Sequence, residues 1–303
     1  MARDRSTVLP RKFRLPTDDG WLQVIEWGSR EPDVTVVLTH GWSLSSSSWE
    51  DVAELLVAAD SAVRVLAYDH RGHGGSATGP ASITVLADDL AAVLRSLVPD
   101  GPIVFGGHSL GGMTLMALAE LYPGVIEARA FGAAFVATSA GDLLGPIRKF
   151  RGVDRLLLAA LAVTARVTLP SKPLFLVRQG TRGVLFGSRP RHHDMNRSIQ
   201  QLARSDPRTV ASLGRSLLQH NRYEALAAFR NVDVVVMAGS KDMLTPPAHA
   251  QRIAEGIPGS QVVVYQGAGH HLPYERREAV AAHLLSLTAK ARASAWKWAR
   301  VTG

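Results

Sequence analysis

"GGHSLGG", residues 106–112, is the most informative stretch of this sequence. An apolar run, "PIVF" at 102–105, comes directly before it, and a helical pattern at 110–123 follows it. Ser109 therefore lies within a G-x-S-x-G pattern at a strand-to-helix turn. Such a turn crowds the neighbouring backbone, so residues without a Cβ atom fit best beside the serine. We predict that Ser109 is a nucleophile raised above a sheet; a capping serine in a glycine-rich turn is the alternative.

Strand-like and helix-like segments alternate on both sides of this turn. Apolar, β-branched runs predict strands at 33–41, 62–69, 102–109, 127–139, 231–240 and 261–269. Helices are predicted up to about residue 59 (capped by Ser46, Ser47 or Ser48), at 84–97 and 110–123, and from about residues 247 and 274. "TDDG" at 17–20 predicts a hairpin within residues 11–28. Repeated strand–helix units predict an α/β fold with a mostly parallel central sheet and helices on both faces.

The alternation breaks at residues 141–218, which are rich in Arg and Leu and are interrupted by Pro. We predict a helical cap, or lid, of residues 141–218 inserted into a core of residues 1–140 and 219–303. The insertion carries 14 Lys and Arg against 4 acidic residues, and residues 288–303 add 4 basic residues and no acid. Since the whole chain has a net charge of +8, the remainder is mildly acidic.

Composition narrows the class of protein. There is no cysteine, which excludes disulfides and thiolate metal sites. The first fourteen residues are charged and lack the apolar centre of a signal peptide, and the longest apolar run, Leu156 to Val163, is too short to cross a bilayer. We therefore expect a cytoplasmic protein. Neither His70 with His73 nor "HHD" at 192–194 supplies convergent ligands, so we predict no metal and no cofactor.

A serine nucleophile needs a base, and the base needs an acid that orients it. Asp242 follows the predicted strand 231–240, and His270 follows the strand 261–269. Active sites of open parallel sheets gather at such strand ends, so both side chains are expected near Ser109. Asp142, after the strand 127–139, is a second candidate for the acid, and Asp242 alone would also suit an ordinary turn before a Pro-started helix.

Five segments, taken together and in order, resemble a capped serine hydrolase, esterase- or lipase-like, of the α/β-hydrolase superfamily. They are "HGWS", "YDHRGHGGS", "GHSLGG", "AGSKDMLTPP" and "GAGHHLPYER", and they touch nearly all of the chain outside 141–218. The resemblance implies the α/β-hydrolase fold and a catalytic triad of Ser109, Asp242 and His270. It also implies an oxyanion hole formed by the backbone N–H groups of Trp42 and Leu110.

The same resemblance suggests supporting roles for other residues. Glu275 is the acid that the family pattern places after the base, and His271 falls on a variable position. For His271 we expect a partly exposed helix-start residue, with a pocket wall as the alternative. We expect His108 to be structural, and Asp69, Arg71 and His73 to form a network that locks their loop.

A serine at the turn, rather than the aspartate of some relatives, implies an acyl-enzyme formed from a carboxylic ester or thioester. Cofactor-free perhydrolysis stays open. So does a non-hydrolytic member of the fold, either a ligand receptor or a catalyst of cyclisation or rearrangement, because the fold alone does not choose a function. The leucines of the insertion either line an acyl pocket or pack on the sheet: Leu156–Leu158, Leu161, Leu174 and Leu176.

The basic insertion has two interpretations. It is a solvated face that balances an acidic body, or it attracts an anionic partner such as an acyl carrier protein, a coenzyme A ester or an anionic lipid surface. Trp296 and Trp298 beside Lys297 suit either peripheral attachment to a membrane or a frayed helix end. Although the isoelectric point is ≈ 10.2, no nucleic-acid-binding motif accompanies the charge, so we predict no nucleic-acid partner.

Overall fold

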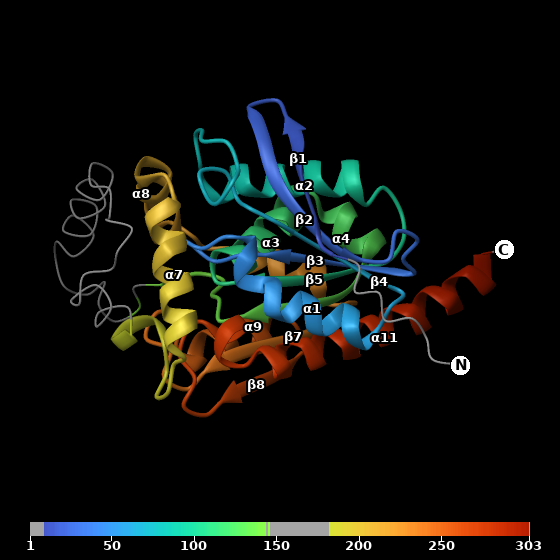
Figure 1. The fold of residues 1–303 in the computed structure, drawn as a ribbon. Coiled ribbons are helices and arrows are strands. Elements are labelled where there is room, and N and C mark those ends of the chain that lie inside the picture. The colour runs from blue at the N-terminus through green and yellow to red at the C-terminus, as the bar shows by residue number, and fades with distance from the viewer. Residues whose placement is uncertain (1–8, 144, 146–181, 303) are drawn as a thin grey trace, which may run out of the picture.

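The computed structural model describes residues 9–143, 145 and 182–302, and side chains up to residue 295 (Figure 1). An eight-stranded sheet crosses the molecule, in the order β1-β2-β4-β3-β5-β6-β7-β8. The first two strands form the expected antiparallel hairpin, β2 also pairs antiparallel with β4, and the remaining pairs are parallel. The strands are β1 (Arg11–Thr17), β2 (Gly20–Gly28), β3 (Val34–Thr39), β4 (Val63–Tyr68), β5 (Ile103–His108), β6 (Ala130–Val136), β7 (Asp233–Gly239) and β8 (Gln261–Tyr265).

Helices cover both faces of the sheet, as predicted. On one face lie α1 (Glu50–Ala59) and α11 (Arg277–Thr302); on the other lie α2 (Ile83–Leu97), α3 (Leu110–Leu121) and α9 (Pro247–Gly256). Successive residues of the buried strands point to opposite faces, so Val36 packs with α1 and α11 whereas Val37 packs with α2 and α3. Because both faces are buried, the central strands read as continuous apolar runs. The fold is therefore the α/β-hydrolase fold that the family resemblance implied.

Two local predictions were wrong. The strand predicted from residue 127 begins only at Ala130, because α4 (Pro123–Arg129) takes up the preceding residues and opens with a Pro at its first position. The serines predicted to cap α1 instead form a short 3₁₀ helix, η1 (Ser46–Trp49), which leads into it. The Ser46 hydroxyl donates to Asp69, so its side chain braces a neighbouring loop.

The insertion interrupts the strand–helix alternation between β6 and β7. Its described part contains α7 (His192–Arg204) and α8 (Pro207–Leu218), and η3 (Glu224–Phe229) then leads back to β7. The insertion leucines singled out above and the side chains of Trp296 and Trp298 lie outside the described residues. Within the described residues, no helix is both long enough and apolar enough to cross a membrane. The cap boundary at 141–218 stays a prediction.

The order of the strands indicates at which edge of the sheet a ligand would bind. The chain passes from β3 to β4 on one side and then to β5 on the other, so the connections diverge above β3 and β5. In open α/β sheets, ligands bind at the carboxyl ends of the strands beside such a divergence. All four segments that carry predicted site residues follow the carboxyl ends of parallel strands, namely β3, β5, β7 and β8.

Candidate active site

Ser109 occupies a strained turn between β5 and α3. Its φ of 51° and ψ of −115° are unfavourable for a residue with a Cβ atom. The turn is held by its neighbours: the Ser109 N–H donates to the carbonyl of Val136 at 2.9 Å, and the Thr138 hydroxyl donates to the carbonyl of Ser109 at 2.7 Å. A Cβ atom on Gly107 would lie 2.7 Å from the backbone of Gly112, so the turn requires glycine there.

The side chains of Ser109, His270 and Asp242 meet at this edge. His270 Nε2 lies 2.9 Å from Ser109 Oγ, and His270 Nδ1 lies 2.8 Å from Asp242 Oδ2. His270 and Asp242 are buried, with exposed fractions of 3% and 4%, whereas Ser109 keeps partial access to solvent. The three residues follow β5, β8 and β7, so tertiary folding brings together groups far apart in the chain.

Asp242 is held as a hydrogen-bond acceptor. Its Oδ1 accepts from the N–H groups of Leu244 at 2.8 Å and Thr245 at 2.9 Å, and its Oδ2 accepts from the Thr245 hydroxyl at 2.8 Å. Burial opposes ionisation, but the facing His270 and the Thr245 donors outweigh it, so the pKa of Asp242 is lowered from its ordinary value. Asp142, the alternative acid, lies elsewhere and pairs with Arg252 at 3.3 Å.

This arrangement defines how protons are shared. An ionised Asp242 has no hydrogen to donate, so the proton between it and His270 belongs to His270 Nδ1. His270 Nε2 then carries the free lone pair, and the Ser109 hydroxyl donates its hydrogen to it. That tautomer is the one in which a histidine accepts a proton from an attacking serine.

The loop after β3 packs on the start of α3, where the two predicted oxyanion donors lie. Leu110 is the first residue of α3, and Trp42 lies three residues beyond Thr39, the end of β3. A Cβ atom on Gly111 would overlap the carbonyl oxygen of Thr39, so the loop and the helix are in close contact. The Trp42 indole N–H donates to the carbonyl of Val210 in α8 at 3.0 Å, which ties this loop to the insertion. The use of both backbone N–H groups as oxyanion donors stays a prediction.

The loop at 68–76 is braced internally. Asp69 Oδ2 accepts from the N–H of Gly75 at 2.7 Å, and Arg71 binds Asp89 through two hydrogen bonds of 2.8 and 2.7 Å. His73 Nδ1 lies 3.0 Å from the carbonyl of Arg71. These contacts agree with a loop-locking network. Among the residues that the structure describes, no group of three or more His, Asp or Glu side chains is placed to hold a metal ion.

His271 is not partly exposed, and that expectation was wrong. Its exposed fraction is 3%, because it is enclosed by the rings of Phe186, Tyr274 and His108 at centroid distances of 4.9, 6.0 and 5.7 Å. Burial, with the nearby rings of His108 and His270, lowers the pKa of His271 well below its ordinary value. Phe186 comes from the insertion, so the sequence around His271 carries no sign of this cover.

His108 is buried beneath the site. Its Nε2 lies 2.9 Å from the backbone carbonyl of His270, and its exposed fraction is 1%. Burial, followed by the neighbouring His270, lowers the pKa of His108 to about 3. The ring is therefore neutral at ordinary pH and braces the loop that carries His270, in agreement with the structural role expected for it.

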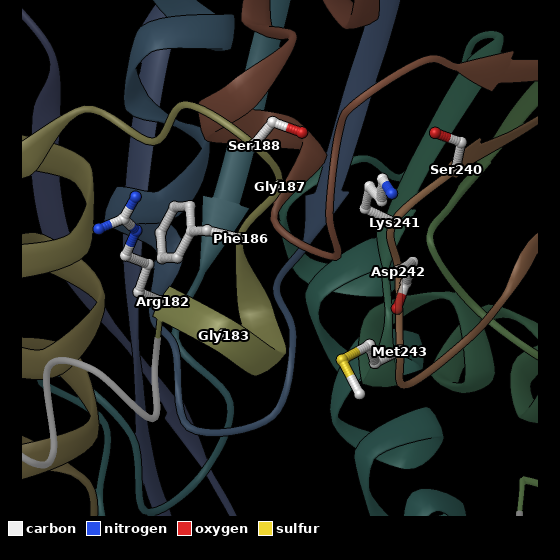
Figure 2. Close-up of a pocket in the computed structure, with 9 residues that line it drawn as sticks. All are labelled: Arg182, Gly183, Phe186, Gly187, Ser188, Ser240, Lys241, Asp242 and Met243. Atoms are coloured by element: carbon white, nitrogen blue, oxygen red, sulfur yellow. The ribbon is translucent and has the colours of Figure 1, made fainter.

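A pocket of ≈ 640 Å³ borders Asp242 (Figure 2). One wall comes from the returning end of the insertion and the other from the loop after β7. Figure 2 shows Arg182 and Phe186 on the first wall, facing Lys241 and Met243 on the second. The lining residues are Arg182, Gly183, Phe186, Gly187, Ser188, Ser240, Lys241, Asp242 and Met243. Met243 is 66% exposed, so an apolar side chain stands beside the candidate acid.

Sequence reasoning missed three contributors to the site. Thr245, three residues after Asp242, had a usable signal, since an Asp side chain often accepts from the residues two and three positions onward. Thr138 had none, because its bond to Ser109 joins the ends of two neighbouring strands. Leu185, whose carbonyl accepts from the N–H of His270 at 2.9 Å, had none either.

The chain is similar to several known proteins. The RutD protein of Caulobacter sp. (strain K31), a proposed carbamate hydrolase, is 26% identical over 277 residues, which cover 89% of this chain and 96% of RutD. The bifunctional esterase/perhydrolase DCH of Acinetobacter calcoaceticus is 38% identical over 100 residues, only 32% of this chain and 35% of DCH. A solved esterase from Thermogutta terrifontis has the same fold, with a TM-score of 0.74, 24% identity, and coverage of 93% of this chain and 99% of that one. The model of the Alpha/beta hydrolase family matches residues 36–283, and the chain therefore belongs to the α/β-hydrolase family.

Proposed function

We propose that this protein is a serine hydrolase that cleaves a carboxylic ester or thioester through an acyl-enzyme. The observation that carries the proposal is the hydrogen-bonded series Ser109–His270–Asp242 at the carboxyl edge of the sheet. Its geometry suits a nucleophile, a general base and an orienting acid, in that order. The family relationship and its hydrolase relatives support the same reaction class.

In the proposed reaction, Ser109 Oγ attacks the carbonyl carbon of the substrate while His270 Nε2 takes the hydroxyl proton. The resulting imidazolium is stabilised by Asp242. The negative charge on the tetrahedral intermediate is received by the backbone N–H groups of Trp42 and Leu110, and loss of one such donor typically costs about 3 kcal/mol. His270 then gives its proton to the leaving alcohol or thiol. Water, activated by the same histidine, releases the acid and regenerates Ser109.

A second candidate is perhydrolysis, in which hydrogen peroxide replaces water and the product is a peracid. The specific support is the relative DCH, which is named as both an esterase and a perhydrolase. The two activities share the acyl-enzyme and differ only in the molecule that resolves it. Carbamate cleavage, named for RutD, would also pass through Ser109.

The test is reaction with a fluorophosphonate probe, followed by turnover of p-nitrophenyl esters of increasing chain length. Wild type should be labelled and should hydrolyse at least one ester, and Ser109→Ala should lose both properties. An aryl carbamate and an acetate–hydrogen peroxide mixture, run in parallel, separate the related activities. If wild type is not labelled and turns over none of these substrates, the proposal is contradicted. That outcome would favour a receptor or a rearrangement catalyst.

Part of the basic charge is already paired with acidic residues of the body. Arg197 of the insertion pairs with Asp51 at 2.9 Å, and Arg292 in α11 pairs with Asp33 and Asp60 at 2.6 and 2.8 Å. These pairs favour the interpretation of a basic surface that balances an acidic body. An acyl carrier protein, a coenzyme A ester or a lipid surface remains a proposal, as does a cytoplasmic location.

A further inference from the structure

The returning end of the insertion lies directly on the loop that carries His270. The carbonyl of Leu185 accepts from the backbone N–H of His270 at 2.9 Å and from that of His271 at 3.2 Å. Three residues later, the N–H of Ser188 donates to the carbonyl of Gly267 at 2.9 Å. We name residues 185–188 the clasp, because its backbone is bonded to both ends of the segment 267–271.

Glycines on both sides allow this close approach. A Cβ atom on Gly187 would overlap the carbonyl oxygen of Gly267, and a Cβ atom on Gly269 would lie 2.5 Å from the backbone of Phe186. The two backbones are therefore in contact along the length of the clasp. A side chain at Gly187 would have to push the clasp and the histidine loop apart.

Glu275 joins the same two segments through its side chain. Its carboxylate accepts from the N–H of Gly187 at 2.8 Å and from that of Gly269 at 3.0 Å. This gives a physical role to the acid that the family pattern places after the base. This pair of bonds holds the clasp and the loop at a fixed separation. Among the described hydrogen bonds, none joins Glu275 to Ser109.

The clasp also covers the imidazole next to the base. Phe186 packs edge-on to His271 at 4.9 Å, and Phe186, Met195 and Tyr274 form a small apolar cluster. Met195 belongs to α7 and Tyr274 to α10 (Leu272–Glu275), so the cluster connects the insertion to the histidine loop. Phe186, Gly187 and Ser188 of the clasp also line the pocket that borders Asp242 (Figure 2).

We propose that the clasp positions His270, so that the base is aligned on Ser109 by the insertion and not by the sheet alone. The inference rests on the proposed hydrolase function. The bond to Asp242 fixes only Nδ1 and leaves the ring free to swing about that point. The Leu185 carbonyl holds the backbone N–H of His270, and His108 holds its carbonyl at 2.9 Å. Together with the bond to Asp242, these contacts place Nε2 at 2.9 Å from Ser109.

Gly187→Ala tests this proposal, with Gly124→Ala in α4 as the matched control. A Cβ atom on Gly124 meets nothing within 4 Å, so that variant should keep wild-type kinetics. Gly187→Ala should lower kcat for p-nitrophenyl acetate by about 10- to 100-fold, the scale expected for a displacement near 1 Å of a catalytic group. Fluorophosphonate labelling should slow by a similar factor, while KM for this small ester changes by less than about threefold.

Hydrogen exchange detects the contact between the clasp and the histidine loop without any substrate. In Gly187→Ala, a peptide spanning 266–275 should exchange its amide hydrogens faster than in wild type, because the His270 and His271 N–H groups lose the Leu185 carbonyl. If Gly187→Ala does not unfold cooperatively, Phe186→Leu replaces it, with a kcat loss of severalfold and little change in KM expected on the same grounds. If wild type is active and its folded clasp variant retains full kcat, this inference alone is overturned. If wild type is inert and unlabelled, the proposed function and the inference are both overturned.

Discussion

Replacing Asp242 with Asn should trap His270 in the wrong tautomer. Oδ1 of Asp242 accepts from two backbone N–H groups, those of Leu244 and Thr245. In Asp242→Asn, the amide oxygen must therefore occupy the Oδ1 position, because an NH₂ group there would face two donors. The NH₂ group is then directed at His270 Nδ1, which must accept.

The magnitude follows from this geometry. With Nδ1 as the acceptor, the proton of the neutral ring lies on Nε2, which faces Ser109 Oγ at 2.9 Å and has no lone pair for the hydroxyl hydrogen. The equivalent change in a serine protease lowers kcat by roughly 10⁴-fold while the structure is preserved. At about 1.4 kcal/mol for each factor of ten, that loss corresponds to about 5.5 kcal/mol of transition-state stabilisation. KM should change little, because Asp242 acts on the base.

The assay is steady-state turnover of p-nitrophenyl acetate at neutral pH, with thermal unfolding as the check on folding. Asp142→Asn is the matched control, since Asp142 pairs with Arg252 and should leave kcat within about twofold of wild type. If Asp242→Asn retains more than about a tenth of wild-type kcat, His270 is not trapped in the wrong tautomer, since the trap requires a loss near 10⁴-fold. If Asp142→Asn is the more damaging of the two variants, Asp242 is not the acid that orients His270.

Three further predictions concern the turn, acid stability and salt. Thr138→Val removes the donor to the Ser109 carbonyl, so unfolding free energy should fall by about 1 kcal/mol and fluorophosphonate labelling should slow; unchanged labelling would show that the strained turn does not need this bond. Burial lowers the pKa of His70 and of His108 to about 3 from the ordinary 6.5, so their contribution to stability is complete above pH 6.5 and is lost as the pH falls towards 3. Between pH 7 and pH 5, each of these two histidines should lower the free energy of unfolding, measured in urea, by about 2 kcal/mol. In His70→Asn this free energy should depend less steeply on pH. A urea midpoint that does not change with pH would contradict the prediction. If the basic insertion attracts an anionic partner, kcat/KM for a carrier-bound acyl thioester should fall steeply with salt while that for a neutral ester does not; an equal salt response would rule out the attraction.

Much of the fold was accessible from the sequence because its signals are local. A buried parallel strand is an apolar run, and the turn at Ser109 needs glycines beside it, so both appear in short windows. The hairpin at residues 17–20 and the order of strands and helices follow in the same way. The misplaced start of β6 and the serines before α1 are boundary errors, where neighbouring packing outweighs the preference of a few residues.

The candidate catalytic groups and their order along the chain, Ser109, then Asp242, then His270, could be recognised without a structure. The folded structure was needed to show that Asp242 and not Asp142 faces His270, because that choice depends on which strand end lies beside β8. It also decided that His271 is enclosed and that the insertion is bonded to the histidine loop. The contacts of the insertion and of His108 with the histidine loop join residues about 80 to 160 positions apart, and such pairs leave no periodic or local trace that a reading along the chain could detect.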